Sequence, residues 1–167
     1  MTDWREGRLA TPLGPLVLVE DAAGRLRGAE WADAEARLAR WLARQRLART
    51  PRRVDVAALA ASAALTAYFD GVLERLADIE VVMTGSPFQQ AVWQALRGLA
   101  PGSTLAYGAL AARLGRPRAA RAVGAANGAN PCAVVVPCHR LVGADGALTG
   151  YAGGLARKRW LLAHEGA

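Results

Sequence analysis

The sequence pattern predicts a helix from Arg118 to about Gly128 that has almost no large side chains, which constrains what can lie against it. After Arg118 the only long side chain is Arg121, and the other positions are mostly alanine or glycine: Ala119, Ala120, Ala122, Gly124, Ala125, Ala126, Gly128 and Ala129. Each glycine destabilises a helix by roughly 1 kcal/mol relative to alanine, so a close approach to something else must offset that cost. The neighbour is either a tightly packed helix or a narrow nucleic-acid groove, in which bulky side chains would clash.

The surrounding segments predict a helix-turn-helix followed by a wing. A shorter helix is expected over 104–114, and Gly115-Arg116-Pro117 would form the turn before the small-faced helix. Ser86 and Pro87 suit the N-cap and first position of an earlier helix that ends near Pro101-Gly102. The glycine-rich residues 143–154 predict a wing and 155–164 a closing helix. We therefore expect a mostly helical winged helix-turn-helix domain over 81–167, although many helical bundles contain a similar turn.

Residues 1–80 predict a small antiparallel sheet with helices. Strand-like runs at 8–12, 16–20 and 26–31 are separated by Gly14-Pro15 and by the turn at 21–24. Helical spacing of apolar residues predicts helices over 33–48 and 56–73, and 79–83 is a strand or an extended linker. No catalytic constellation occurs in this part. The chain is thus expected to be an α+β protein, with a supporting domain at 1–80 and a second domain at 81–167.

The positive charge of the chain is concentrated near its C-terminus. Residues 1–100 hold 13 arginines and 12 acidic residues, whereas 101–167 hold seven arginines and Lys158 against only Asp145 and Glu165. Nearly all of the net charge of +7 therefore lies in the second part, which favours a polyanionic partner such as nucleic acid. The alternative is a codon bias toward arginine and alanine, since Lys158 is the only lysine.

Membrane insertion and secretion are not expected. No apolar run approaches the roughly 18 residues of a membrane-spanning helix, and Asp3, Arg5 and Glu6 do not fit a signal peptide. The two cysteines are too few for a secreted disulfide framework. We therefore expect a cytoplasmic protein.

A candidate nucleophile follows the apolar run at 133–136, which we interpret as a buried strand. The run ends at Pro137 and is followed by Cys138, His139 and Arg140. A thiolate is a nucleophile, and a nearby imidazole or positive charge lowers the pKa of a thiol. Adjacent residues of an extended chain point in opposite directions, so His139 would reach Cys138 only through a turn or a bridging water. Glu165 could orient the imidazole, which would give a Cys–His–Glu relay.

Two other interpretations of the cysteines stay open at this point. A single cysteine is most often a small buried hydrophobic residue, so Cys138 could be structural. Cys132, Cys138, His139 and His164 could together offer four ligands, but their spacing matches no common zinc pattern.

The sequence resembles the O6-alkylguanine-DNA alkyltransferases, also called methylated-DNA–protein-cysteine methyltransferases. The segment at 135–140, Val-Val-Pro-Cys-His-Arg, is similar to the active-site signature of that family. Further matches in order and spacing occur at 86–89, 101–102, 107–110, 119–124, 130–131, 150–154 and 160–166. The resemblance is strong over 86–167 and weaker over 1–85, where 11–16 is similar to the N-terminal hairpin of the family. It implies a ribonuclease H-like N-terminal domain.

The resemblance implies roles for the chemically active residues. Cys138 would accept the alkyl group, His139 would take the thiol proton through a water, and Glu165 would hold the imidazole. Tyr107 would lie near the flipped nucleotide and donate a proton or hydrogen bond as guanine leaves. Hydrogen-bond donation at the point where charge develops would stabilise the transition state.

The resemblance also implies which residues bind DNA and the damaged base. The small-faced helix would enter the minor groove, where Arg121 would fill the space left by the extruded base. The other contacts of that helix would come from Ala120, Ala122, Gly124, Ala125 and Asn127. Asn130 would be a structural hinge between the helix and the active-site segment. The base pocket would be formed by Leu141, Tyr151, Ala152, Gly153 and Lys158.

The implied function is irreversible, single-turnover transfer of an alkyl group from O6-alkylguanine, and also from O4-alkylthymine, to Cys138. The partner would be double-stranded DNA with alkylated bases, bound by a monomer that can cluster on DNA, and no cofactor or metal would be needed. Vertebrate members of the family carry an N-terminal zinc site, but this chain has no cysteine or histidine before Cys132. Ala152 replaces a serine of some relatives and offers only its backbone to the base.

Three alternative functions account less well for the same residues. A relative that binds alkylated DNA without repairing it would lack the acceptor, and Cys138 argues against this. A winged-helix regulator would leave Tyr107, Cys138, His139 and Glu165 without a purpose. A cysteine hydrolase would turn over repeatedly and would need no DNA.

Overall fold

The computed structural model describes residues 3–45 and 50–167, and these residues divide into two compact units. The first unit contains the described residues up to Val82 together with Pro131–Val135. The second contains Met83–Asn130 and Val136–Ala167. The segment Pro131–Val135, which lies between the two parts of the second unit in the sequence, therefore belongs to the first unit. In the described residues no helix is long and apolar enough to cross a membrane.

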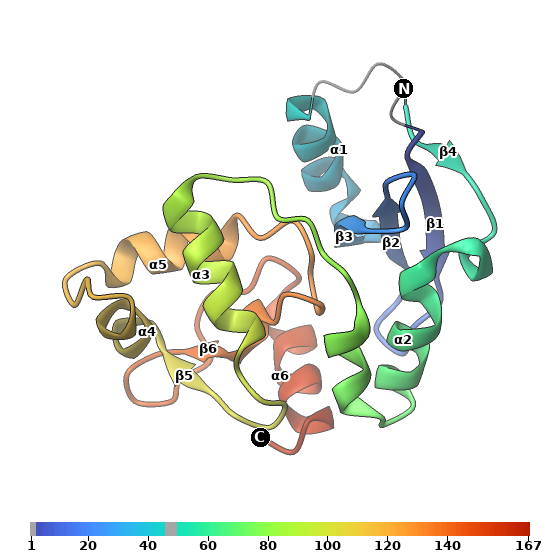
Figure 1. Cartoon of the computed structure of the whole chain (residues 1–167). Helices are drawn as coiled ribbons and strands as arrows, with labels where there is room; N and C mark the ends of the chain where they lie inside the picture. The colour runs from blue at the N-terminus through green and yellow to red at the C-terminus, as the bar shows by residue number, and fades with distance from the viewer. Residues whose placement is uncertain (1–2, 46–49) are drawn as a thin grey trace. The chain divides into compact units, whose positions relative to one another are not determined.

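A four-stranded sheet forms the centre of the first unit (Figure 1). Its strands lie in the order β3-β2-β1-β4, and their bounds are β1 Arg5–Leu9, β2 Leu16–Glu20, β3 Leu26–Trp31 and β4 Arg52–Arg53. The first three strands are an antiparallel meander in which Leu16 pairs with both Leu9 and Trp31, and β4 runs parallel to β1. The expected strands at 16–20 and 26–31 are confirmed, while the first strand lies earlier than expected.

Helices pack against this sheet, and one of them uses a sheet side chain to complete its N-terminus. α1 (Glu35–Arg44) buries Leu38 in a cluster with Trp4, Val17 and Val19. α2 (Ala60–Phe69) begins at the buried carboxylate of Glu20, which accepts hydrogen bonds from the amides of Ala60 and Ala61 at 3.0 and 2.7 Å. A carboxylate at this position satisfies amides that have no partner within the helix. The helix expected over 33–48 is thus shorter, and its last part lies outside the described residues.

The open edge of β3 is covered by two short parallel contacts, Leu26 with Val81 and Ala29 with Cys132. The second contact belongs to the apolar run at 133–136, for which the expectation of a buried strand is wrong. Only Cys132 bridges to the sheet, residues 133–135 form a turn, and Val134 has the left-handed φ of 70°. An apolar run of four residues carries no periodicity, so burial alone did not distinguish a strand from a buried turn.

The second unit consists of helices around a two-stranded parallel pair, β5 (Leu105–Ala106) and β6 (Leu141–Val142). The other elements are α3 Pro87–Arg97, α4 Tyr107–Arg113, α5 Ala120–Gly128, the 3-10 helix η4 Cys138–Arg140 and α6 Leu155–His164. Ser86 and Gln89 form a capping box at the start of α3, as the sequence predicts for Ser86. α4 and α5 form the expected helix-turn-helix around Gly115, whose φ is 72°. α4 starts at Tyr107 because the two preceding residues pair with β6.

Candidate active site

Cys138 lies in a tight turn that two asparagines hold from the end of α5. Its amide donates to the carbonyl of Val136 at 2.7 Å, and η4 begins at Cys138 itself. Asn130 donates from Nδ2 to the same Val136 carbonyl at 2.8 Å, and Asn127 donates from Nδ2 to the Cys138 carbonyl at 3.3 Å. Both asparagines and Cys138 are buried. The turn therefore fixes the position of the thiol through its backbone, and Asn130, which was predicted to be a structural hinge, bonds to this turn.

His139, Glu165 and Arg140 form a buried network beside Cys138. Nε2 of His139 lies 2.8 Å from Oε1 of Glu165. Arg140 donates from Nη2 to Oε1 at 2.8 Å and from Nε to Oε2 at 2.9 Å, so its guanidinium holds both oxygens of the carboxylate. The Glu165 and His139 side chains have no exposed surface. The sequence predicted the contact of His139 with Glu165 but not the contribution of Arg140.

The charges of this network favour an ionised carboxylate and a neutral imidazole. Burial raises the pKa of Glu165, but the hydrogen bonds from His139 and Arg140 outweigh it and bring the pKa well below its usual range. Burial lowers the pKa of His139, and the hydrogen bond to Glu165 opposes this only in part. An ionised carboxylate can only accept, so Nε2 of the neutral ring carries the proton and Nδ1 has a free lone pair. Nδ1 is buried and has no hydrogen-bond partner among the described residues.

Tyr107 reaches the same region through the pairing of β5 with β6. Its hydroxyl donates to the carbonyl of Thr149 at 3.2 Å. Burial, and to a smaller extent the charge of a Cys138 thiolate, raise the pKa of the phenol. Hydrogen bonds with Thr149 and Asn127 lower it. The net result is a raised pKa, so Tyr107 stays protonated and keeps a proton to donate. Its position is that of a hydrogen-bond donor close to the thiol.

Lys158 fastens the loop after β6 to the strand itself. Its side chain is fully buried, and Nζ donates to the carbonyls of Leu141 at 2.5 Å and Thr149 at 2.9 Å. Nζ also lies 6.0 Å from the centre of the Tyr107 ring. Burial lowers the pKa of Lys158, and the charge of a Cys138 thiolate raises it. Tyr151, Ala152 and Gly153, which the resemblance assigns to the base pocket, follow Thr149 in the loop that Lys158 holds.

The exposed surface of α5 is small-faced, as the sequence predicts. Arg121, Ala122 and Ala125 are exposed, and Ala120 and Gly124 are partly exposed. A Cβ built on Gly124 would lie 3.8 Å from the Tyr107 ring, which is an ordinary van der Waals contact. The packing within the protein would therefore also accept an alanine at this position. Underneath, Trp93 of α3 donates from Nε1 to the carbonyl of Ala126 at 2.8 Å.

Asn127 departs from the set of groove contacts expected on α5, because it is buried and binds the Cys138 carbonyl. The spacing of three between Asn127 and Asn130 could have indicated this burial. Residues three apart near the end of a helix lie on the same side, and here both bind the turn that contains Cys138.

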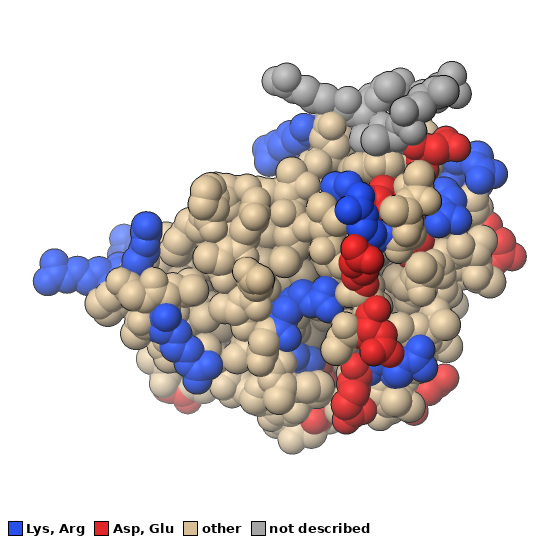
Figure 2. Space-filling view, viewed as in Figure 1, with Lys and Arg blue, Asp and Glu red and all other residues tan. Residues whose placement is uncertain are grey.

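Basic side chains extend the α5 surface across the turn and α4. Arg113, Arg116 and Arg118 are exposed, and no acidic residue occurs between 101 and 144. Figure 2 shows basic side chains, which the sequence identifies as arginines, projecting from the part of the second unit that holds α4 and α5. This charge suits a polyanion.

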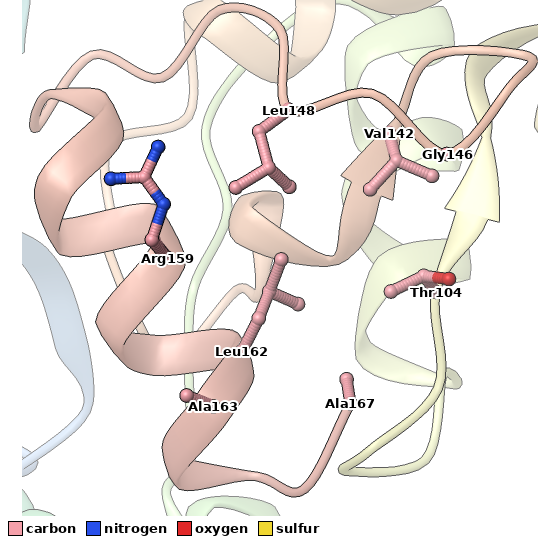
Figure 3. A pocket seen from close by; sticks show the side chains of 8 residues that line it. All are labelled: Thr104, Val142, Gly146, Leu148, Arg159, Leu162, Ala163 and Ala167. Carbon is pink, nitrogen blue, oxygen red and sulfur yellow. The ribbon is translucent and has the colours of Figure 1, made fainter.

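A pocket of about 350 Å³ lies elsewhere in the second unit, between α6 and the loop after β6 (Figure 3). Its lining is Thr104, Val142, Gly146, Leu148, Arg159, Leu162, Ala163 and Ala167. It contains neither Cys138 nor any other nucleophilic thiol or titrating base. The chemistry therefore points to the Cys138 turn and not to this pocket. In the described residues no group of His, Cys, Asp and Glu could hold a metal ion.

Comparisons with known proteins find similar sequences and folds over nearly the whole chain. The DNA-binding domain model of the 6-O-methylguanine DNA methyltransferases matches residues 87–167. The methylated-DNA–protein-cysteine methyltransferase of Salmonella typhimurium is 51% identical over 162 residues, covering 96% of this chain and 95% of that protein. The crystal structure of Mycobacterium tuberculosis O6-methylguanine methyltransferase aligns with a TM-score of 0.78 at 37% identity, covering 98% and 93% of the two chains. That of Mycobacterium tuberculosis OGT in complex with DNA aligns with a TM-score of 0.73 at 34% identity, covering 97% and 92%. The expected α+β fold class is confirmed.

Proposed function

The chain belongs to the methylated-DNA–protein-cysteine methyltransferases, enzymes of DNA repair that bind DNA, and we propose that it transfers the methyl group of O6-methylguanine to Cys138 once and irreversibly. The observation that carries the proposal is the buried turn that places Cys138 directly before His139, whose imidazole is hydrogen-bonded to Glu165. Tyr107 is near enough for the charge of a Cys138 thiolate to raise its pKa. A nucleophile, a neutral base and a hydrogen-bond donor are the groups that this reaction needs.

The proposed reaction begins with the loss of the thiol proton. Nδ1 of His139 accepts it, directly or through water, and Glu165 stabilises the imidazolium that forms. The sulfur then attacks the methyl carbon, so that an S–C bond forms while the bond from that carbon to O6 breaks. The electron pair remains on guanine, which takes up a proton that Tyr107 donates. His139 returns its proton to Tyr107 through solvent, which closes the proton balance.

The product explains why the protein would act once. Cys138 becomes a thioether, which has no easily broken bond to the new carbon and no acidic proton. Neither a cofactor nor a metal is needed to balance the step. Transfer from O4-alkylthymine uses the same bond changes and belongs to the same proposal.

Access to the methyl group requires the nucleotide to leave the base stack. We assign insertion of the exposed Arg121 into the vacated space, with the small-faced surface of α5 in the minor groove. Flipping costs a few kcal/mol, which contacts of Arg113, Arg116 and Arg118 with phosphates would offset. The protein is proposed to act as a monomer that can cluster on DNA.

A Cys138→Ala variant tests the assignment of the acceptor. We expect no methyl transfer from a duplex containing O6-methylguanine, with DNA affinity retained because the α5 surface is unchanged. Cys132→Ala is the matched control, since that thiol is also buried and should leave transfer intact. Transfer that survives in Cys138→Ala and disappears in Cys132→Ala would reassign the acceptor.

A further inference from the structure

Arg140 is a buried arginine whose guanidinium nitrogens all donate hydrogen bonds within the protein. Its exposed fraction is 3%, and three of its nitrogens make hydrogen bonds. Besides the two bonds to Glu165, Nη1 donates to the carbonyl of Leu99 at 2.5 Å. Leu99 follows the end of α3 at Arg97, so the guanidinium is anchored to that helix on one side and to the carboxylate on the other.

Arg140 restricts the orientation of the Glu165 carboxylate through a fork of two hydrogen bonds, from Nε to Oε2 and from Nη2 to Oε1. Two parallel hydrogen bonds fix a carboxylate plane more strictly than a single one. Oε1 then faces Nε2 of His139 at 2.8 Å, while it also accepts from Arg140 at 2.8 Å. A lysine at this position would supply a point charge but could not hold both oxygens.

Burial is the main cause of the lowered pKa of His139, and Arg140 adds to it by offsetting part of the charge of Glu165. The charged groups that act on the imidazole are Glu165, Arg140 and Lys158. Glu165 raises the pKa of His139, whereas Arg140 and Lys158 lower it together with burial. A carboxylate without its arginine would favour the imidazolium, which cannot accept a proton from Cys138.

We propose that Arg140 is a positioning residue for methyl transfer, which holds the carboxylate of Glu165 against His139 and offsets its charge. This inference rests on the proposed function and assigns a part of it to a residue that touches neither the thiol nor the base. The imidazole then waits as a neutral, oriented acceptor for the thiol proton.

The test is the pH dependence of single-turnover transfer from an O6-methylguanine duplex, measured on the full chain. In the wild type, the rate falls at low pH as His139 becomes protonated. In Arg140→Met the pKa of His139 rises because a positive charge near the imidazole is removed, so the acid limb of the pH–rate profile moves to higher pH and the rate near neutral pH falls severalfold. In Arg140→Lys the limb stays in place, but the rate falls severalfold at every pH because the fork is lost. Arg159→Met, an exposed arginine on α6, is the matched control and should leave both unchanged.

The outcomes separate positioning from simple stabilisation. A proportional loss in Arg140→Met at all pH values, with the limb unmoved, would overturn the proposal. If that variant does not fold, Arg140→Lys decides alone: a wild-type rate refutes the role of the fork, and a shifted limb refutes the role of the charge. A wild-type protein that accepts no methyl group at any pH would instead remove the proposed function itself.

Discussion

Replacing Glu165 with glutamine should destabilise the protein far more than an ordinary surface substitution. The glutamine oxygen can still accept from Nε2 of His139, but its amide nitrogen would face Nε of Arg140, donor against donor. Arg140 would lose the 2.9 Å bond from Nε, and the 2.8 Å bond from Nη2 would keep only a neutral acceptor. The buried guanidinium would then lack its counter-charge, so the expected loss is about 3–5 kcal/mol, the range for breaking a buried ion pair by removing one partner.

Urea unfolding followed by tryptophan fluorescence measures this loss, and Glu35→Gln is its matched control. Glu35 binds Arg8 through both carboxylate oxygens at 2.9 and 3.0 Å, but 42% of its side chain is exposed. An exposed pair contributes about 0–1 kcal/mol, so the control should change stability little. A Glu165→Gln variant no less stable than Glu35→Gln would refute the argument that burial makes the Glu165 network strong.

The pH dependence of the effect follows from the pKa of Glu165, which is lower in the folded protein than in the unfolded chain. The stabilisation from the carboxylate is then complete above the unfolded pKa of about 4.3 and is lost as the pH falls below it. The difference between wild type and Glu165→Gln should therefore be constant from about pH 6 to about pH 8 and should shrink in acid. A difference that grows as the pH falls would contradict the assigned charge.

Three further substitutions test the DNA surface, the donor and the loop. Arg121→Ala should slow methyl transfer in duplex DNA more than transfer from the free base O6-methylguanine, and equal losses would argue against a role in flipping. Tyr107→Phe should slow single-turnover transfer about a hundredfold while DNA affinity in a binding titration stays the same; a wild-type rate would exclude the hydroxyl as donor. Lys158→Met removes the hydrogen bonds of Nζ to the Leu141 and Thr149 carbonyls, so unfolding should show a loss of about 1–3 kcal/mol and the loop at 143–154 should exchange its amide hydrogens faster. Unchanged exchange in that loop would contradict the role of Lys158 as its anchor.

Local rules of sequence predicted the elements whose ends are marked by particular residues. α6 has the expected bounds, because glycines precede it and Gly166 follows Glu165. α3 begins where Ser86 and Pro87 indicate, and the meander strands at 16–20 and 26–31 lie between clear turns. The partnership of His139 with Glu165 was accessible because Asp145 and Glu165 are the only acids after residue 100.

Features that depend on tertiary contacts were not accessible in the same way. The run at 133–136 forms a turn because the chain leaves the sheet after a single bridge at Cys132, which no local pattern encodes. The pairing of β5 with β6 shortens the helix expected from 104, and it does so through residues 36 positions apart. In the sequence, Arg140 is only an extra positive charge near the thiol and Asn127 only a groove contact, because their partners come from distant segments.

The measurement that tests the central claim most directly is the intact mass of the protein before and after incubation with a duplex carrying O6-methylguanine, followed by peptide mapping. We predict one added methyl group per molecule, on the peptide that contains Cys138, and no further gain with excess DNA. A folded, DNA-binding protein whose mass does not change, or a methyl group on a different residue, would contradict the account.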